Sequence, residues 1–306
     1  LVYAIGDIHV FYIPVYQTAA VLAAAGVAGW GSGSRARATA AGLLLLALLV
    51  SVGVRFPAAR QEALATVPAA PQDYWQPALG SAPPDAILLS NDRNEIVPMW
   101  YEQYAEGNRP DLLGLFPLIS PEPAYAHIGA LADRALGTDR PVCLIKDMPG
   151  IEVGFRLDPA GSPLRCLAGL WERPPQGEAQ WLSEELLLLG ADVPKGALRP
   201  GADFFITLYW QARSPLASPY STYVHILDEG GNPVWTGSDH RPGGDYLPAD
   251  LWLPGQVIRD EHALAVPADA APGDYRLLVG MYEYPSLQGY GSALVAGTLS
   301  VTAGEP

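Results

Sequence analysis

The stretch "DFFITLYWQA", residues 203–212, carries an apolar side chain at every second position. This period of two is typical of a β-strand with one buried face. Similar segments, separated by Gly and Pro turns, occur on both sides of it, at residues 184–193, 221–229, 232–238, 256–267, 273–284 and 292–302. So many short strands in succession predict an antiparallel β-sandwich, which we place at residues 179–303.

The large aromatic residues of the predicted sandwich have two interpretations. They could form a platform for sugar rings or fill the space between the two sheets, and their alternation with polar neighbours favours the core. These residues are Trp210, Tyr223, Trp235, Trp252, Tyr275 and Tyr282.

Acidic residues gather near the predicted turns of the sandwich, at Asp239, Asp245, Asp250 and Asp260. Carboxylates of this kind can bind calcium. Their spacing matches no calcium-binding loop, so a solvated rim is favoured and no metal site is predicted.

Residues 85–178 show a different pattern, in which strands alternate with helices. The strands are expected at 85–90, 109–118 and 140–147, and the helices at 94–107 and 121–137. This order predicts a small α/β domain with a Rossmann-like parallel sheet.

The sequence "SNDRNE", residues 90–95, follows the first strand of this sheet. Ligands bind beyond the carboxyl ends of such strands, so Asp92 and Arg93 are candidate substrate-binding residues. The alternative is that Asn91 or Asn94 caps the next helix and that Asp92 and Arg93 are solvated. No glycine-rich loop follows the strand, and no cofactor is evident.

Two apolar runs near the start of the chain predict a membrane hairpin with helices at about 8–30 and 38–56. A signal peptide is an alternative for the first run, and a buried helical hairpin is an alternative for the pair. Arg35 and Arg37 lie between the runs, and the positive-inside rule places them in the cytoplasm. The predicted location is the bacterial plasma membrane, with an Ala- and Pro-rich linker at 57–84 and the later domains outside the cytoplasm.

The chain has 18 Lys and Arg against 32 Asp and Glu, a net charge of −14. The first 60 residues hold four Arg and one acid, Asp7, so the remainder is more acidic still. Such a surface repels nucleic acid, which we exclude as a partner. Because the chain begins at Leu1 and close to an apolar run, we expect it to be the tail of a longer protein.

Cys143 and Cys166 are the two cysteines, and no C-x-x-C motif is present, so a zinc site is not expected. They can form a disulfide if the domain lies outside the cytoplasm, or Cys143 can be buried in its apolar strand. The sequence holds no H-E-x-x-H motif and no G-x-S-x-G motif, and the catalytic residues stay unassigned.

Several segments together resemble the C-terminal part of bacterial membrane proteins related to protein O-mannosyltransferases, the family 39-like glycosyltransferases with the C-type membrane fold. They include "GDIHVFYIPVY", the "RPD" of the α/β region and the sandwich run "LPADLWLPGQVIRDEHALAVPADAAPGDYRLL". The resemblance implies an enzyme in the lipid bilayer that transfers a sugar from a polyprenyl-phosphate donor to a glycan or protein acceptor at the outer face. Members of this fold carry their catalytic carboxylate in an earlier external loop, so this fragment alone is expected to be inactive.

Asp7 and His9 lie at the edge of the first apolar run, where ionisable groups are costly and often functional. On the resemblance they would face the donor or acceptor, and the alternative is an ordinary interfacial belt with the nearby tyrosines. The alternative function for the whole chain is a membrane-anchored carbohydrate-binding or structural module of the cell envelope.

Overall fold

The computed structural model describes residues 71–118, 122–158, 164–174, 178–235 and 237–303, together with isolated helical positions between 18 and 54. The chain divides into two units, Leu1–Ala70 and Pro71–Pro306. The elements below all belong to the second unit.

The structure contradicts the membrane hairpin of the predicted fold class. Throughout the described residues, no helix combines the length and the apolar character that crossing a membrane requires. The longest helix with defined bounds has 12 residues, which is about 18 Å against a bilayer core of about 30 Å. Most residues of the predicted spans 8–30 and 38–56 lie outside the described part of the chain. The fold is dominated by three β-sheets instead.

The first sheet of the unit is five-stranded, with the order β2-β1-β3-β5-β4. Its strands are β1 (Ile87–Leu89), β2 (Leu113–Leu115), β3 (Val142–Leu144), β4 (Phe155–Leu157) and β5 (Arg165–Leu170). β1 runs parallel to β2 and β3, whereas β5 is antiparallel to both β3 and β4. The sheet is therefore mixed, because the chain returns after β3 through hairpin pairings and not through another helical crossover.

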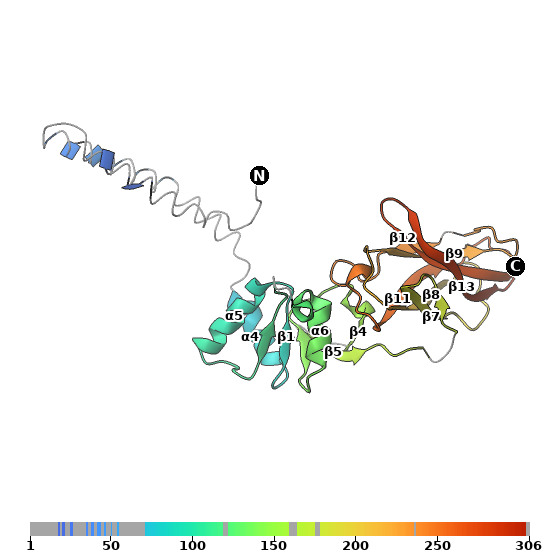
Figure 1. Ribbon diagram of the computed structural model, residues 1–306, viewed down its shortest axis with the longest axis horizontal. Helices are drawn as coiled ribbons and strands as arrows, with labels where there is room; N and C mark the ends of the chain where they lie inside the picture. The colour runs from blue at the N-terminus through green and yellow to red at the C-terminus, as the bar shows by residue number, and fades with distance from the viewer. Residues whose placement is uncertain are drawn as a thin grey trace. The chain divides into compact units, whose positions relative to one another are not determined.

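Helices cover both faces of this sheet (Figure 1). α4 (Pro71–Ser81) and α5 (Arg93–Tyr104) pack on the face that carries Leu88 and Cys143. α6 (Ile128–Leu136) packs on the opposite face, against Leu89 and Leu144. Burial on both faces explains why β1 and β3 are continuous apolar runs. Short 3₁₀ helices η1 (Pro123–Tyr125) and η2 (Ile151–Val153) lie between these elements.

The β-sandwich consists of two four-stranded sheets, with the orders β10-β9-β12-β13 and β11-β8-β7-β6. All their strand pairs are antiparallel. The strands are β6 (Gln180–Trp181), β7 (Leu186–Asp192), β8 (Asp203–Ala212), β9 (Ser221–Leu227), β10 (Ser238–His240), β11 (Val257–Ala265), β12 (Gly273–Glu283) and β13 (Gln288–Val301).

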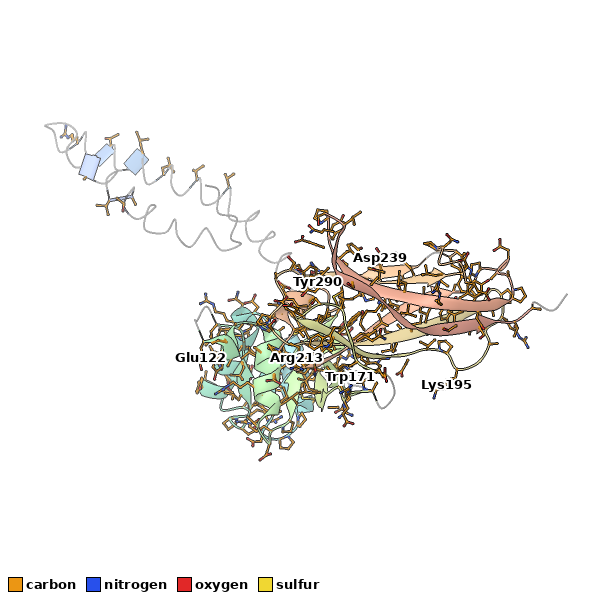
Figure 2. The ribbon with its side chains drawn as sticks, turned by 45° about the vertical axis from the view of Figure 1, so that its right-hand side comes forward. Glu122, Trp171, Lys195, Arg213, Asp239 and Tyr290 are labelled. Carbon is orange, nitrogen blue, oxygen red and sulfur yellow. A yellow bond between two sulfur atoms is a disulfide. The ribbon has the colours of Figure 1, made fainter. Side chains whose placement is uncertain are left out.

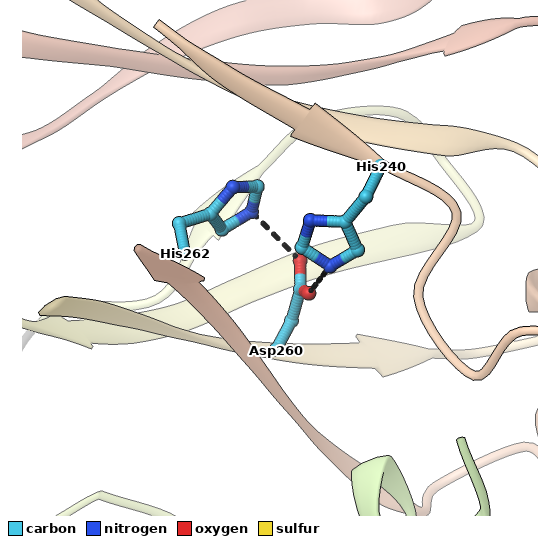
Figure 3. Close-up of side chains that lie close together, drawn as sticks. All are labelled: His240, Asp260 and His262. Atoms are coloured by element: carbon cyan, nitrogen blue, oxygen red, sulfur yellow. Dashed lines mark hydrogen bonds and ion pairs between the residues drawn. The ribbon is translucent and has the colours of Figure 1, made fainter. Parts of the chain in front are cut away.

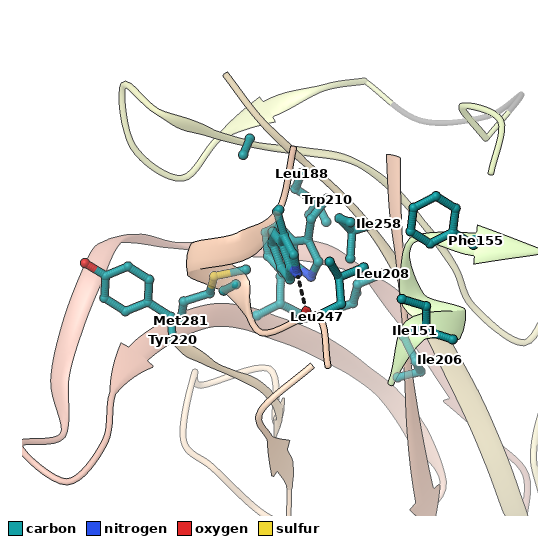
Figure 4. Close-up of a cluster of buried hydrophobic side chains, with 14 of the residues drawn as sticks. Ile151, Phe155, Leu188, Ile206, Leu208, Trp210, Tyr220, Leu247, Ile258 and Met281 are labelled. Atoms are coloured by element: carbon teal, nitrogen blue, oxygen red, sulfur yellow. Dashed lines mark hydrogen bonds between the residues drawn. The ribbon is translucent and has the colours of Figure 1, made fainter. Parts of the chain in front are cut away.

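Alternate residues of the strands fill the space between the two sheets. From β8, Ile206, Leu208 and Trp210 point inward and are fully buried (Figure 4). They share one cluster with Val279 and Met281 of β12. The apolar residues that alternate along each strand thus form the inner face of its sheet, and the residues between them form the outer face.

The sandwich core continues into the mixed sheet. The segment 241–256, which contains the 3₁₀ helix η3 (Ala249–Leu251), connects β10 to β11. Its residues Leu247 and Trp252 belong to the same buried cluster as Phe155 and Trp210. The Nε2 of Gln256 also donates a hydrogen bond of 3.0 Å to the carbonyl of Gly154. The two parts therefore share one hydrophobic core.

Candidate functional site

The outer face of the sheet β10-β9-β12-β13 carries two tyrosines beside a carboxylate. Tyr223 of β9 pairs with Asp239 of β10 on one side and with Gly280 of β12 on the other. Tyr282 lies two residues beyond Gly280 and so points to the same face. We call Tyr223, Asp239 and Tyr282 the tyrosine face. It lies on the opposite side of the sandwich from Trp171 (Figure 2).

The groups of the tyrosine face are held in place by one another. The hydroxyl of Tyr282 donates a hydrogen bond of 2.7 Å to Oδ2 of Asp239. The centroids of the Tyr223 and Tyr282 rings are 6.4 Å apart, and the rings are tilted by 39°. The Tyr223 ring is also 4.6 Å from that of His225. Both tyrosine side chains are partly exposed, whereas Asp239 is exposed.

Gly280 determines how Tyr223 lies on the sheet. A Cβ built on Gly280 would come within 2.7 Å of Cζ and 2.9 Å of Cε1 of Tyr223. The ring therefore occupies the space directly above the glycine, and only a residue without a side chain leaves that space free. The side chain of Tyr223 is only partly exposed on the outer face of the sheet.

Both tyrosines stay neutral near neutral pH. The hydrogen bond to Asp239 raises the pKa of Tyr282, and burial adds to this shift. Burial raises the pKa of Tyr223. The tyrosine face therefore offers two uncharged rings and a carboxylate whose second oxygen can accept further hydrogen bonds.

A second group of polar side chains comes from β10 and β11 (Figure 3). It includes His240, which follows Asp239 on β10 and so points to the inner side of the sheet. We call His240, Asp260 and His262 the His-Asp-His cluster. Nε2 of His240 is 2.8 Å from Oδ1 of Asp260, and Nε2 of His262 is 3.2 Å from Oδ2. Asp260 and His262 are fully buried, whereas the side chain of His240 is 38% exposed.

Three further residues surround the cluster. Nε1 of Trp210 donates a hydrogen bond of 3.2 Å to Oδ2 of Asp260. Oγ of Ser238 is 3.1 Å from Nδ1 of His262, and Oγ1 of Thr222 is 3.3 Å from its Nε2. The cluster is therefore a polar network within an otherwise apolar core.

Electrostatics inside the cluster are dominated by Asp260. Burial alone would raise its pKa, but the hydrogen bonds from His240 and His262 lower it well below the usual range. The hydrogen bond to Asp260 raises the pKa of His240, although burial acts in the opposite direction. The carboxylate is thus ionised and favours the protonated form of His240.

The structure defines the local contacts of the residues predicted to bind substrate in the α/β region. Asp92 caps α5 by accepting a hydrogen bond of 2.8 Å from the backbone N–H of Asn94, and Arg93 is exposed. At the same edge of the sheet, Glu95 accepts a hydrogen bond from Ser90 and forms a 2.6 Å ion pair with Lys146. These groups satisfy one another. The capping alternative expected Asn91 or Asn94 as the helix cap. In the structure the cap is Asp92.

Asp7 and His9 lie outside the described residues. Cys143 and Cys166 are joined by a disulfide between directly opposite positions of β3 and β5.

The six aromatic residues considered for a sugar platform lie in two places, the core and the outer face of a sheet. Trp210, Trp252 and Tyr275 are buried, and Trp235 packs on Tyr275 with ring centroids 4.4 Å apart. Tyr223 and Tyr282 instead lie on the outer face.

Three of the four acidic residues considered for calcium have separate partners. Asp239 accepts from Tyr282, Asp245 pairs with Arg241, and Asp260 pairs with two histidines. Oδ1 of Asp250 is buried and has no hydrogen-bond partner among the described residues. They do not form one calcium site.

No protein-family model and no curated protein matches this chain. Among solved structures, it is similar to one described as the C-terminal domain of wzt, with a TM-score of 0.33 and 16% identity. That match covers 42% of this chain and 81% of the other. A structure of AvmM, which is described as catalysing macrocyclization in alchivemycin A biosynthesis, matches with a TM-score of 0.23 and 14% identity, over 38% of this chain and 89% of the other. Both similarities are too low to support an inference about function.

Proposed function

We propose that this chain recognises a carbohydrate and binds it across the tyrosine face. The observation that carries the proposal is the ring of Tyr223, which lies over Gly280 beside a carboxylate held by Tyr282. The negative face of an aromatic ring attracts the C–H groups of a sugar ring. The free oxygen of Asp239 accepts hydrogen bonds from sugar hydroxyls.

The charge of the protein narrows the class of carbohydrate. The chain has a net charge of −14, and Asp239 places a further negative group within the site itself. Like charges at close range oppose binding, so we expect a neutral glycan and not an anionic one.

The resemblance to glycosyltransferases agrees with a sugar as the ligand. Transfer of a sugar requires catalytic residues, and we assign none among the described residues. We therefore assign recognition of the glycan to this chain, as part of a protein that acts on the cell envelope. The disulfide between Cys143 and Cys166 favours an oxidising compartment for this role.

The test is isothermal titration of the full chain with a neutral mannan and a neutral glucan, and with polygalacturonate as the anionic contrast. Tyr223→Ala should weaken binding of the neutral glycan about 2- to 10-fold, since an aromatic contact contributes about 0.5–1.5 kcal/mol. Phe205→Ala is the matched control, because Phe205 is 58% exposed on β8 of the other sheet. Equal affinity of the wild type and Tyr223→Ala, or binding to none of the three polysaccharides, would reject the proposal.

A further inference from the structure

We propose that His240, Asp260 and His262 bind a divalent transition-metal ion, which we assign as Zn²⁺. This inference is independent of the carbohydrate proposal, because it rests on the inner side of β10 and on β11. The sequence did not predict this site.

The first argument is the set of donor atoms and their spacing. Two imidazole nitrogens and one carboxylate oxygen form a ligand set that suits Zn²⁺. The three donor atoms all lie within 4.8 Å of one another. Around a tetrahedral ion with bonds of about 2.1 Å, such atoms would be about 3.4 Å apart. At present Nε2 of His240 is 2.8 Å from Oδ1 of Asp260 and Nε2 of His262 is 3.2 Å from Oδ2. These are hydrogen-bond distances to different oxygens, so binding of an ion requires a small outward shift of the partly exposed His240 side chain.

The second argument is that neighbouring groups orient the ligands. Ser238 is 3.1 Å from Nδ1 of His262, and Trp210 donates to Oδ2 of Asp260. Partners of this kind are typical of metal sites, where they fix the ring and the tautomer of a ligating histidine. Without an ion, Nε2 of His262 donates to Asp260. Binding of the ion would replace this proton, and Nδ1 of His262 would then donate to Ser238 while Nε2 presents its lone pair to the ion.

The third argument concerns charge. Asp260 is fully buried, and both ion pairs found for it in the described part of the chain are with histidines. A buried carboxylate is costly unless a cation compensates its charge. One protonated histidine could compensate the charge of Asp260, but the other histidine would then have no charged partner. One metal ion satisfies all three side chains at once.

The fourth argument is access to solvent. His240 lies on the three-residue strand β10 at the edge of its sheet, and its side chain is 38% exposed. An ion can therefore enter from the side of His240. With three protein ligands, the fourth position of the ion would be filled by water on that side.

The test is titration of the chelator-treated full chain with ZnCl₂. We expect binding of one ion per chain, and His240→Gln should weaken it by at least 10-fold, since even loss of an outer partner of a ligand weakens metal binding about 10- to 100-fold. His240 is the first variant because its side chain is partly exposed and its replacement leaves the buried pair in place. His262→Gln and Asp260→Asn follow.

The matched control is Glu261→Gln, which changes an exposed carboxylate between two of the ligands on β11, on the outer face of its sheet. It should bind Zn²⁺ like the wild type. Substitution with Co²⁺ adds a spectroscopic readout, because a tetrahedral Co²⁺ site gives a visible absorption band that His240→Gln should abolish. Absence of stoichiometric binding by the wild type, or equal binding by His240→Gln, would overturn the proposal and leave a hydrogen-bonded His-Asp-His network.

Discussion

The ring of Tyr223 lies directly over the backbone of Gly280 on the neighbouring strand, in the space that a side chain at position 280 would occupy. This relationship holds the ring against the sheet. Because the nearest atoms belong to the outer end of the tyrosine side chain, a new Cβ would displace the ring and not the backbone.

We therefore expect Gly280→Ala to weaken glycan binding about 2- to 10-fold, as Tyr223→Ala does, while leaving the free energy of unfolding within about 1 kcal/mol of the wild-type value. Titration with the neutral polysaccharide and urea denaturation measure the two effects. Gly289→Ala is a suitable control, because a Cβ there meets nothing within 4 Å. Unchanged binding by Gly280→Ala would show that the position of this ring does not matter for the ligand.

Gly150 has a different role, at the contact between the mixed sheet and the segment 241–256. Its φ of +100° is one that L side chains rarely adopt, and a Cβ would overlap the carbonyl of Gly243. We expect Gly150→Ala to lower the free energy of unfolding by about 2 kcal/mol or more. Urea denaturation checks this, with Gly196→Ala as the control in open space. Equal denaturation midpoints for the two variants would contradict the expectation.

The disulfide should contribute to stability through the unfolded state. Cys143 and Cys166 are separated by 23 residues, and closing a loop of this length stabilises a protein by about 3 kcal/mol. Reductant should therefore lower the urea midpoint of the wild type and leave that of the Cys143→Ala/Cys166→Ala double variant unchanged. A wild-type midpoint that does not respond to reductant would argue against the bond.

The raised pKa of Tyr290 predicts how the free energy of unfolding changes at alkaline pH. Its ring stacks on Tyr220 with centroids 4.2 Å apart, and its hydroxyl donates to Glu185 at 2.7 Å. Burial and this hydrogen bond raise the pKa of Tyr290 to about 12, although a hydrogen bond from Ser183 acts against them. In the unfolded chain the pKa is about 10. The folded state thus holds its proton more tightly, and stability falls as the pH rises from about 10 towards 12.

The measurement is urea denaturation of the wild type and Tyr290→Phe at pH 9 and pH 11. The loss of stability between these pH values should be smaller in Tyr290→Phe. Tyr284→Phe, at a side chain that is 73% exposed, is the control. The same loss in the wild type and Tyr290→Phe would exclude this tyrosine as the cause.

The strands with a long alternating pattern could be located from the sequence, because one buried face imposes a period of two. β8 occupies Asp203–Ala212, the same residues as the quoted stretch. Other elements depend on packing that has no local signal. Helix α4 (Pro71–Ser81) falls in the segment predicted as a linker, since its Pro and Ala residues show no period. Trp75 and Leu79 bury it against Met99.

The His-Asp-His cluster could not be assembled from the sequence for a similar reason. His240 lies beyond the strand predicted at 232–238, and only the pairing of β10 with β9 brings it behind Asp239. Asp260 and His262 did carry a signal. They occupy two inward positions of a strand whose other inward residues, such as Ile258 and Leu264, are apolar and buried. Polar residues at core positions are typical of functional or specially stabilised sites.

The membrane hairpin was predicted from two uncharged apolar runs of about membrane-spanning length and from the basic loop between them. Among the described residues no helix has the required length and apolar character, and the helices with defined bounds have 9 to 12 residues. The glycosyltransferase function inferred with it stays a prediction.

The shared core of the mixed sheet and the sandwich has a mechanical consequence. Domains joined by flexible linkers swing independently, and tension on a bound polymer is first absorbed by the hinge. Here Leu247 and Trp252 are buried in the joint between the two parts, and Gln256 is bonded across it. The described residues between 71 and 303 should therefore respond to pulling as one stiff body. A polysaccharide held on the sandwich would then keep a fixed angle to the mixed sheet, and force along it would load the packed joint directly.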